Sequence, residues 1–117
     1  MNINELVTTA HRNSVNKGFW DDMPEPGESV IHYISMKLAL IHSEVSEVLE
    51  ELRDGHPMDA TRYTAGGKPE GIPSELADII IRVADLAGAF PEIDLEDMVI
   101  EKMGYNSSRP YKHGRTV

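Results

Sequence analysis

One long amphipathic segment constrains this chain most, and we predict that it forms a helix over about residues 29–53. Its apolar residues recur at spacings of three and four, which place them on one face of an α-helix. They are Leu38, Ile41, Val45, Val48, Leu49 and Leu52. Ser29 is a suitable N-cap, and Gly55 followed by Pro57 ends the helix. Because so long an apolar stripe must be buried against other helices, the segment favours a helical bundle.

Three further helices are predicted, over about residues 3–17, 74–89 and 95–106. Ser74 and Asp94 are the expected N-caps of the last two. Apolar residues at helical spacing indicate the inward faces of these two helices. They are Leu76, Ile79, Ile80, Val83, Leu86, Ala87 and Phe90 in the first, and Leu95, Met98, Val99 and Met103 in the second. No segment has the alternating period of a strand, so we predict a single all-α domain, residues 1–117, of about four helices.

Two connecting segments lack any period. Residues 19–27 contain two prolines and the only tryptophan of the chain, Trp20. Residues 55–72 are rich in glycine and proline, and a loop of this length in a compact domain is often functional. The end of the chain, residues 107–117, is a basic tail.

The charge balance excludes several classes of function. The chain has 20 acidic and 11 basic side chains and a formal net charge of −9. Nucleic acids and anionic membranes require a basic surface, so we expect neither as a partner. The absence of cysteine excludes thiolate metal sites and cysteine nucleophiles. With no apolar run of membrane-spanning length and no signal peptide at the start, we expect a cytoplasmic protein.

The carboxylates follow a pattern on two predicted helices. Glu44, Glu47 and Glu51 fall in one lane beside the apolar stripe of the long helix. Glu75 and Asp78 form a second lane beside the apolar arc of the next helix. Packing the two apolar sides together brings both lanes to one seam, where the carboxylates repel each other unless a cation is bound. Oxygen ligands without Cys or His at ligand spacing select Mg²⁺ or Mn²⁺.

Two other interpretations of these carboxylates stay open. Pairs of the form Glu-x-x-Glu are common on solvated helix faces, where they bind nothing. A di-iron carboxylate bundle is a rival metal site, but it requires Glu-x-x-His on two helices, and these pairs lack that spacing.

A basic and polar face is predicted near the end of the chain. Lys102, Asn106 and Arg109 are spaced at i, i+4 and i+7, with Tyr105 beside them and Lys112 shortly after. Lys and Arg are the usual protein partners of phosphate groups. No Walker phosphate loop is present, so phosphate binding would depend on a metal and on side chains such as these. The alternative is a solvated basic tail.

Together these residues resemble the signature of the MazG-type all-α nucleoside triphosphate pyrophosphohydrolases, which is Glu-x-x-Glu, a spacer and Glu-x-x-Asp. Here it reads Glu44-Val45-Ser46-Glu47, a spacer of 27 residues and Glu75-Leu76-Ala77-Asp78. Further blocks that resemble the family are residues 39–44, 67–72, 75–82, 102–106 and 109–114. The similarity covers most of the chain.

The resemblance implies a MazG-like helical bundle completed by oligomerisation, as a homodimer or homotetramer whose helices share the active site. The Mg²⁺ ligands that it implies are Glu44, Glu47, Glu75 and Asp78. The phosphate-binding residues that it implies are Lys102, Asn106 and Arg109, with Tyr105 and Lys112 beside them. Ile81 lies off the main apolar arc of its helix, which fits an extra surface buried between subunits.

Three more residues are assigned less directly. Family members contact the base from the first helix and the loop after it, which points to Asn13 and to Trp20, the latter by stacking. Ordinary packing is the equal alternative for both. Arg82 stands where some relatives have Tyr, and it would either touch phosphate or pair with Asp78 or Asp85 on its own helix.

The implied reaction splits a (d)NTP with water into (d)NMP and pyrophosphate, a step of nucleotide-pool housekeeping. An activated water would attack the α-phosphorus, with Glu47 as general base. Lys102 and Arg109 would stabilise the departing pyrophosphate, and the 55–72 loop would close over the site. The alternatives are a non-catalytic helical oligomerisation module, a nucleotide-binding module without turnover, and a relative acting on phosphoribosyl-ATP.

Overall fold

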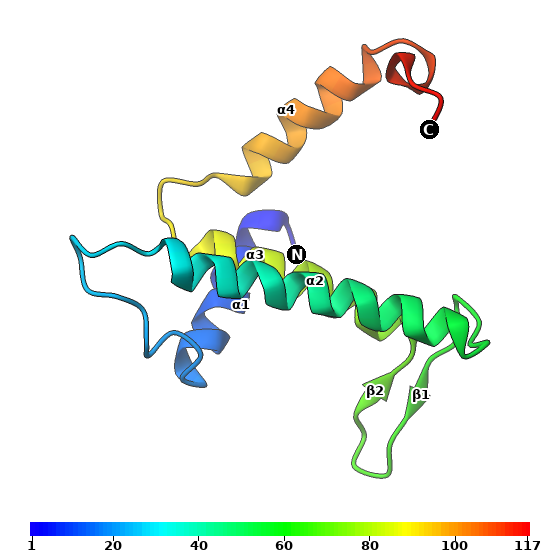
Figure 1. The fold of residues 1–117 in the computed structure, drawn as a ribbon, viewed down its shortest axis with the longest axis horizontal. Helices are drawn as coiled ribbons and strands as arrows, with labels where there is room; N and C mark the ends of the chain where they lie inside the picture. Colours follow the sequence, from blue (N-terminus) through cyan, green and yellow to red (C-terminus); the bar gives the residue numbers. More distant parts are fainter.

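The computed structural model describes the whole chain, residues 1–117, as an arrangement of four α-helices. Figure 1 shows α1 (Ile3–Asn16), α2 (Ile31–Arg53), α3 (Ile72–Gly88) and α4 (Leu95–Ser107). Two short strands, β1 (Arg62–Tyr63) and β2 (Pro69–Glu70), pair as an antiparallel hairpin between α2 and α3, and a 3₁₀ turn, η1 (Tyr111–Gly114), lies near the end. The all-α prediction is therefore confirmed at this level, and the hairpin is an addition that no strand period indicated.

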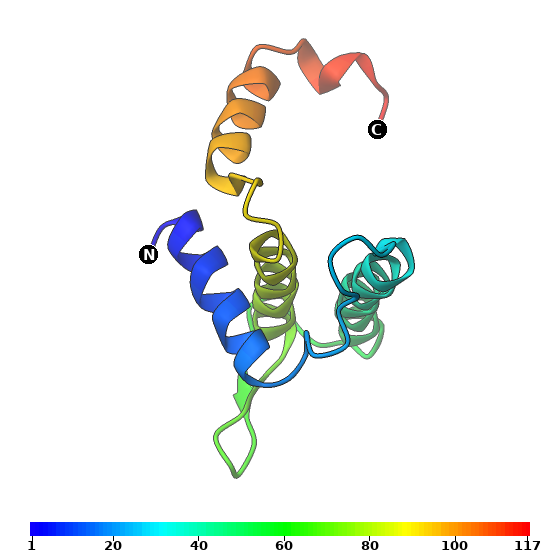
Figure 2. The same ribbon diagram turned by 90° about the vertical axis from the view of Figure 1, so that its left-hand side faces the viewer.

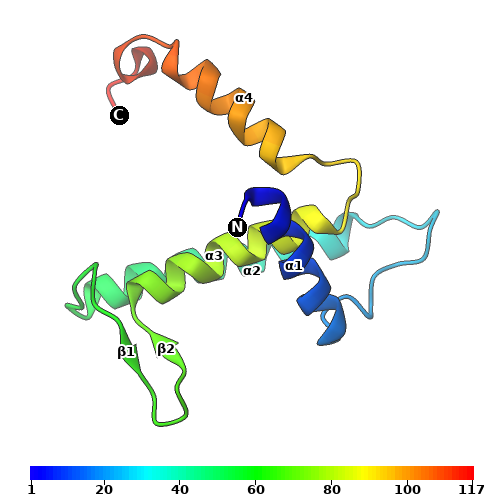
Figure 3. The ribbon, with the colours of Figure 1, turned by 180° about the vertical axis from the view of Figure 1, so that it is seen from behind.

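Helix α3 is the centre of the arrangement. It lies antiparallel to α2 on one side and contacts α1 on the other, and α1 and α2 do not pack against each other (Figure 2). Seen from behind, α1 crosses α3 at a steep angle while α2 runs along the far side (Figure 3). The close approach of α1 depends on small residues, since Ala10, Ala84 and Ala87 are all buried. Gly88 also belongs to this contact, because a Cβ there would lie 2.5 Å from Cβ of His11.

Helix α2 begins two residues later than predicted. Val30 occupies the N-cap position and makes no side-chain hydrogen bond to the helix. Ser29, the predicted cap, stands one residue further out, and its Oγ accepts a long hydrogen bond from Ile31 N at 3.4 Å. The prediction of Ser29 as the cap is wrong because the preceding turn already places Val30 at the helix start.

Helix α3 begins earlier than predicted, at Ile72, with Gly71 at the N-cap position. Pro73 is accommodated in the first turn, where the backbone N–H groups have no partner within the helix. The predicted cap, Ser74, instead donates from Oγ to the carbonyl of Pro69 at 3.1 Å. The start is fixed by burial, since Ile72 is the largest fully buried side chain of the protein.

The hairpin is attached to α2 by an ion pair. Arg62 donates from Nη2 to Oε1 of Glu51 at 3.1 Å, and its Nε lies 3.5 Å from Oε2 of Glu70. A two-stranded hairpin is only marginally stable by itself in water, so this attachment holds it in place. At its base Gly71 has a φ of 116°, and a Cβ there would collide with the backbone carbonyl of Ala60.

Helix α4 leaves the other helices and contacts only α1 to any extent (Figure 1). The predicted cap is confirmed, because the side chain of Asp94 accepts a hydrogen bond from Asp97 N at 3.0 Å. Glu96 Oε1 accepts the backbone N–H of Ile3 at 3.0 Å, so α4 supplies an acceptor to the first turn of α1. None of the helices is both long and apolar enough to span a membrane.

The apolar faces that were predicted to be buried are open to solvent in the single chain. Only seven residues are buried, and the radius of gyration of 17.0 Å exceeds the roughly 13 Å of a compact domain of this length. Residues of the predicted inward faces with more than a third of their surface exposed are Leu38, Val45, Leu49 and Leu52 on α2, Leu76, Ile80 and Val83 on α3, and Met98 and Met103 on α4. Ile81 is also 45% exposed. The prediction of burial is wrong within one chain because α2 has a neighbour on one side only and α4 points away.

Replacing Gly88 by Ala tests the contact between α1 and α3. The new Cβ would overlap His11, and overpacking of this kind costs about 1–3 kcal/mol. This cost exceeds the gain of about 1 kcal/mol from the better helix propensity of Ala. We expect the midpoint of thermal unfolding, followed by circular dichroism, to fall by several degrees. Gly104→Ala is the matched control, since nothing lies within 4 Å of a Cβ there, and a similar fall in that variant would contradict the packing argument.

Candidate metal centre

Three carboxylates from two helices meet at the seam between α2 and α3. Glu44 extends from α2, and Glu75 and Asp78 extend from α3 one turn apart. One oxygen from each lies within 4.8 Å of the others. Two oxygens bound to one Mg²⁺ lie at most about 4.2 Å apart, so small side-chain rotations would bring all three into coordination. The group could therefore hold a metal ion.

Glu44 is buried and Glu75 is partly buried, which distinguishes them from ordinary surface acids, whereas Asp78 is exposed. Glu44 is only 8% exposed, and Oε2 of Glu75 is buried with no hydrogen-bond donor near it. The pKa of Glu75 is raised to about 7, chiefly by burial and in addition by the neighbouring carboxylates of Glu47, Asp78 and Glu44. An unsatisfied buried carboxylate oxygen is costly, and a bound cation would remove that cost.

Glu47, the fourth predicted ligand and the predicted general base, lies next to the three. Its side chain is exposed, and its oxygens are not among those that meet at the seam. Its carboxylate nevertheless acts on the centre, because it helps to raise the pKa of Glu75. Its roles as ligand and as base stay predictions.

Arg82 lies across the seam and bonds to a carboxylate of the other helix. Its Nε donates to Oε1 of Glu44 at 2.7 Å, and the two side chains are 43% and 11% exposed. The expected pairing with Asp78 or Asp85 on its own helix is not observed. The side chain is long enough to cross from α3 to α2, and the buried carboxylate there attracts the guanidinium more strongly than a solvated one.

A cleft of about 560 Å³ extends from this centre between α1, α2 and α3. Glu44, Asp78 and Arg82 line it, together with Lys37, which is seven residues and about 10 Å before Glu44 along α2. Asn13, a predicted base contact, also lines the cleft, and its side chain is exposed.

Trp20, the predicted stacking residue, is held by its own chain. Its Nε1 donates to Oδ1 of Asp85 at 2.9 Å, and the same oxygen lies 2.9 Å from Nδ1 of His11. The rings of His11 and Trp20 meet edge to face, with their centroids 5.1 Å apart. Nζ of Lys37 lies 4.4 Å from the centroid of the Trp20 ring. These contacts favour the packing alternative, in which Trp20 fixes the loop after α1 to α3.

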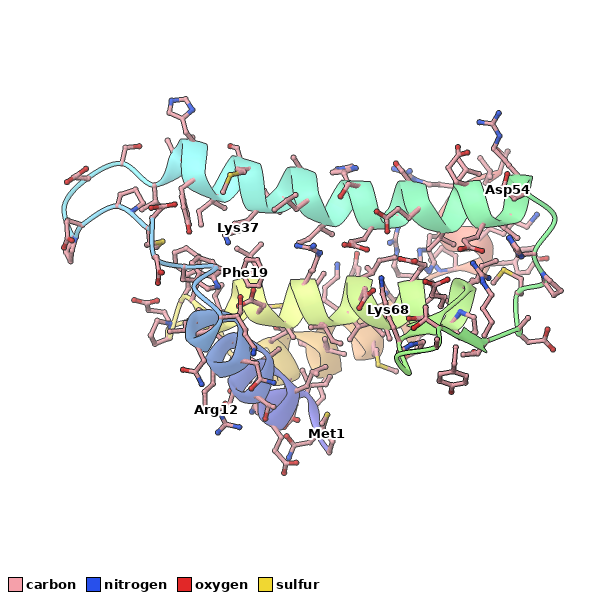
Figure 4. The ribbon with its side chains drawn as sticks, turned by 90° about the horizontal axis from the view of Figure 1, so that it is seen from below. Met1, Arg12, Phe19, Lys37, Asp54 and Lys68 are labelled. Carbon is pink, nitrogen blue, oxygen red and sulfur yellow. The ribbon has the colours of Figure 1, made fainter.

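Phe19 and Lys37 are cleft residues that the sequence analysis missed. The side chain of Phe19 lines the cleft and is 66% exposed, so its ring is available to a ligand. Its carbonyl accepts hydrogen bonds from Nζ of Lys37 at 2.6 Å and from the hydroxyl of Tyr33 at 3.1 Å (Figure 4). The signal for Lys37 was its spacing of seven from Glu44, which puts both on one face of the long helix.

The predicted phosphate-binding residues do not reach the centre in the same chain. Nζ of Lys102 and Cζ of Arg109 each lie 5.6 Å from the ring centroid of Tyr105, so these three side chains do gather as their spacing predicted. Asn106 and Lys112 are exposed. None of the five lines the cleft, because α4 leads away from α2 and α3.

Comparison with protein-family models, with curated proteins and with solved structures finds no match for this chain. The resemblance to the MazG-type enzymes therefore stays a prediction from the motifs, and the geometry of the carboxylates carries the functional interpretation.

The raised pKa of Glu75 predicts how the stability of the metal-free protein depends on pH. The pKa is about 7 in the folded state and 4.5 in the unfolded state, so the folded state holds this proton more tightly. This contribution to stability is complete below pH 4.5 and is lost as the pH rises through 7. We expect the unfolding midpoint, measured with chelator present, to fall over this range more steeply in the parent than in Glu75→Gln.

Glu50→Gln serves as the control for that series, since the Glu50 side chain is 61% exposed and distant from the seam. It should keep the pH dependence of the parent. Identical curves for the parent and Glu75→Gln would show that Glu75 does not titrate as described.

Proposed function

We propose that the chain is a Mg²⁺-dependent nucleoside triphosphate pyrophosphohydrolase that converts (d)NTP and water into (d)NMP and pyrophosphate. The observation that carries the proposal is the meeting of Glu44, Glu75 and Asp78 beside a cleft that Glu44 and Asp78 line. A solvated acidic face would not bury Glu44 or leave Oε2 of Glu75 without a donor. These features support a cation site.

The donor set favours Mg²⁺, with Mn²⁺ as a substitute. The group consists of carboxylates alone, and the chain has no cysteine. Hard oxygen ligands suit these two ions, whereas iron, zinc and copper sites commonly include His or Cys. The lack of a histidine in the group argues against the di-iron alternative.

The cleft suits a ligand that is anionic at one end and aromatic at the other. Its volume of about 560 Å³ lies within the usual range for small-molecule sites. The carboxylates and Arg82 would face the phosphates, and the exposed ring of Phe19 would face the base. Lys37 adds a positive charge beside Phe19, since its Nζ donates to the Phe19 carbonyl at 2.6 Å.

Each residue has a role in the proposed hydrolysis. When bound, Mg²⁺ neutralises phosphate charge and makes water more acidic. Glu47 is exposed beside the buried centre, so its carboxylate accepts a proton from the attacking water. Asp85 holds Trp20 and His11 and so keeps the loop with Phe19 at the mouth of the cleft.

A second copy of the chain completes the site in this proposal, as a homodimer or homotetramer of MazG-like bundles. A chain that buries only seven residues gains too little from burial to offset its conformational entropy. The exposed apolar faces of α2 and α3 would pack against their counterparts in another copy. Lys102 and Asn106 on the projecting α4, and Arg109 just after it, would then contact phosphates at a neighbour's carboxylates.

The reaction is tested by pyrophosphate release from a panel of ribo- and deoxynucleoside triphosphates and phosphoribosyl-ATP, with Mg²⁺ and with chelator. We expect release that requires Mg²⁺ and falls about 100-fold or more in Glu47→Gln, because a general base contributes roughly 10²–10⁴-fold. Glu50→Gln, on the same helix but outside the seam, should keep the parent rate. A folded parent without turnover on any of these substrates would refute the enzyme proposal and favour a binding or scaffold role.

Phe19→Ala tests the aromatic end of the cleft. Stacking of a base on an aromatic ring contributes about 1–3 kcal/mol, so KM should rise roughly tenfold or more while kcat changes little. Phe19→Tyr keeps a ring and should resemble the parent. Trp20→Phe removes the hydrogen bond to Asp85 and should lower the unfolding midpoint instead. An unchanged KM in folded Phe19→Ala would exclude Phe19 as a base contact.

A further inference from the structure

Arg82 makes the only ion pair to the carboxylates of the candidate metal centre. Its Nε donates to Oε1 of Glu44 at 2.7 Å, and neither Glu75 nor Asp78 has a cationic partner in the chain. The pair crosses from α3 to α2 at the point where the cleft begins. The guanidinium of Arg82 thus lies at a carboxylate that a bound metal ion would also contact.

The two side chains differ in their freedom to move. The Glu44 side chain is 11% exposed and packed between the helices, whereas the Arg82 side chain is 43% exposed and lines the cleft. Nη1 and Nη2 of Arg82 make no hydrogen bond within the chain. Arg82 therefore has free donors directed to the same cleft, and it can leave Glu44 without disturbing the packing of α3.

A divalent ion and Arg82 compete for the same carboxylate. Both interact with Glu44 through its negative charge, and the charge-assisted hydrogen bond must be broken or weakened when an ion binds there. Once released, the planar guanidinium is suited to a phosphate oxygen, which it can bind with two donors. A triphosphate that binds in the cleft together with Mg²⁺ would bring both groups at once: the ion for Glu44 and a phosphate oxygen for Arg82.

We propose that Arg82 is an internal counter-ion that makes the centre take up its metal together with the triphosphate and disfavours uptake of the metal alone. In the nucleotide-free protein Arg82 neutralises Glu44 and weakens binding of the free ion. In the complex Arg82 transfers to a phosphate of the ligand, so the same side chain strengthens nucleotide binding. This inference rests on the proposed function, because it concerns the metal and the substrate of that site.

The counter-ion role predicts two effects of opposite sign. In Arg82→Met, binding of Mn²⁺ or Mg²⁺ without nucleotide should become about tenfold tighter, measured by isothermal titration calorimetry. Binding of a triphosphate analogue with a non-hydrolysable α–β bridge, at saturating Mg²⁺, should become about tenfold weaker. Loss of a merely structural ion pair would weaken both or change neither.

Arg53→Met is the matched control, since Arg53 also pairs with a glutamate of α2, Glu50, but outside the metal centre. It should leave both affinities unchanged. Arg82→Lys keeps the charge without the planar fork, so the affinity for free metal should stay near that of the parent. Arg82→Gln provides the same pair of measurements if Arg82→Met does not fold.

The outcomes separate this inference from the proposed function. A parent that binds no divalent ion, with or without the analogue, would refute the metal centre itself and the function built on it. A parent that binds the ion, with metal affinity equal or weaker in Arg82→Met, would overturn the counter-ion proposal and leave the function standing. Tighter metal binding with an unchanged affinity for the analogue would overturn the transfer to phosphate.

Discussion

Repulsion among carboxylates at the seam between α2 and α3 is the constraint on which the rest of this structure depends. One oxygen each of Glu44, Glu75 and Asp78 lies within 4.8 Å of the others, and because Glu44 is buried and Glu75 partly buried, their like charges are costly. Two features of the protein reduce that cost, namely the ion pair of Glu44 with Arg82 and the raised pKa of Glu75. Such a cluster is suited to a divalent cation, because one ion of charge +2 could neutralise the carboxylates in place of Arg82 and of the proton on Glu75.

Helix α3 connects the carboxylates to α1 and to the loop after α1. One side of α3 supplies Glu75 and Asp78, and the other packs closely against α1 through small residues such as Ala84 and Gly88. Asp85 lies between these two sides and accepts hydrogen bonds from Trp20 and His11. As a result the loop after α1 is fixed beside the cleft, and the cleft has walls from three helices. The same helix therefore determines both the charge of the site and the shape of its entrance.

Many apolar side chains of this chain are exposed to solvent. Apolar residues on α2, α3 and α4 stay exposed, and α4 is attached mainly through Glu96 at the start of α1. Such surfaces are unfavourable in water, and the proposed association with another copy of the chain would bury them. Lys102 on α4 and Arg109 after it do not line the cleft of their own chain, so in the proposed assembly the association would also decide where they act.

The sequence by itself determined the four helices and the grouping of residues along each, because helical spacing is a local property. It placed Glu75 and Asp78 one turn apart and gathered Lys102 and Arg109 around Tyr105, as the structure has them. The tertiary structure alone decided which helices meet. Arg82 binds α2 instead of its own helix, and Arg62 holds the hairpin. Phe19 and Trp20 both line the cleft, but Phe19 is exposed and Trp20 is buried. The physical reason is that packing sets the distances between helices, and burial then selects the partner of each charge.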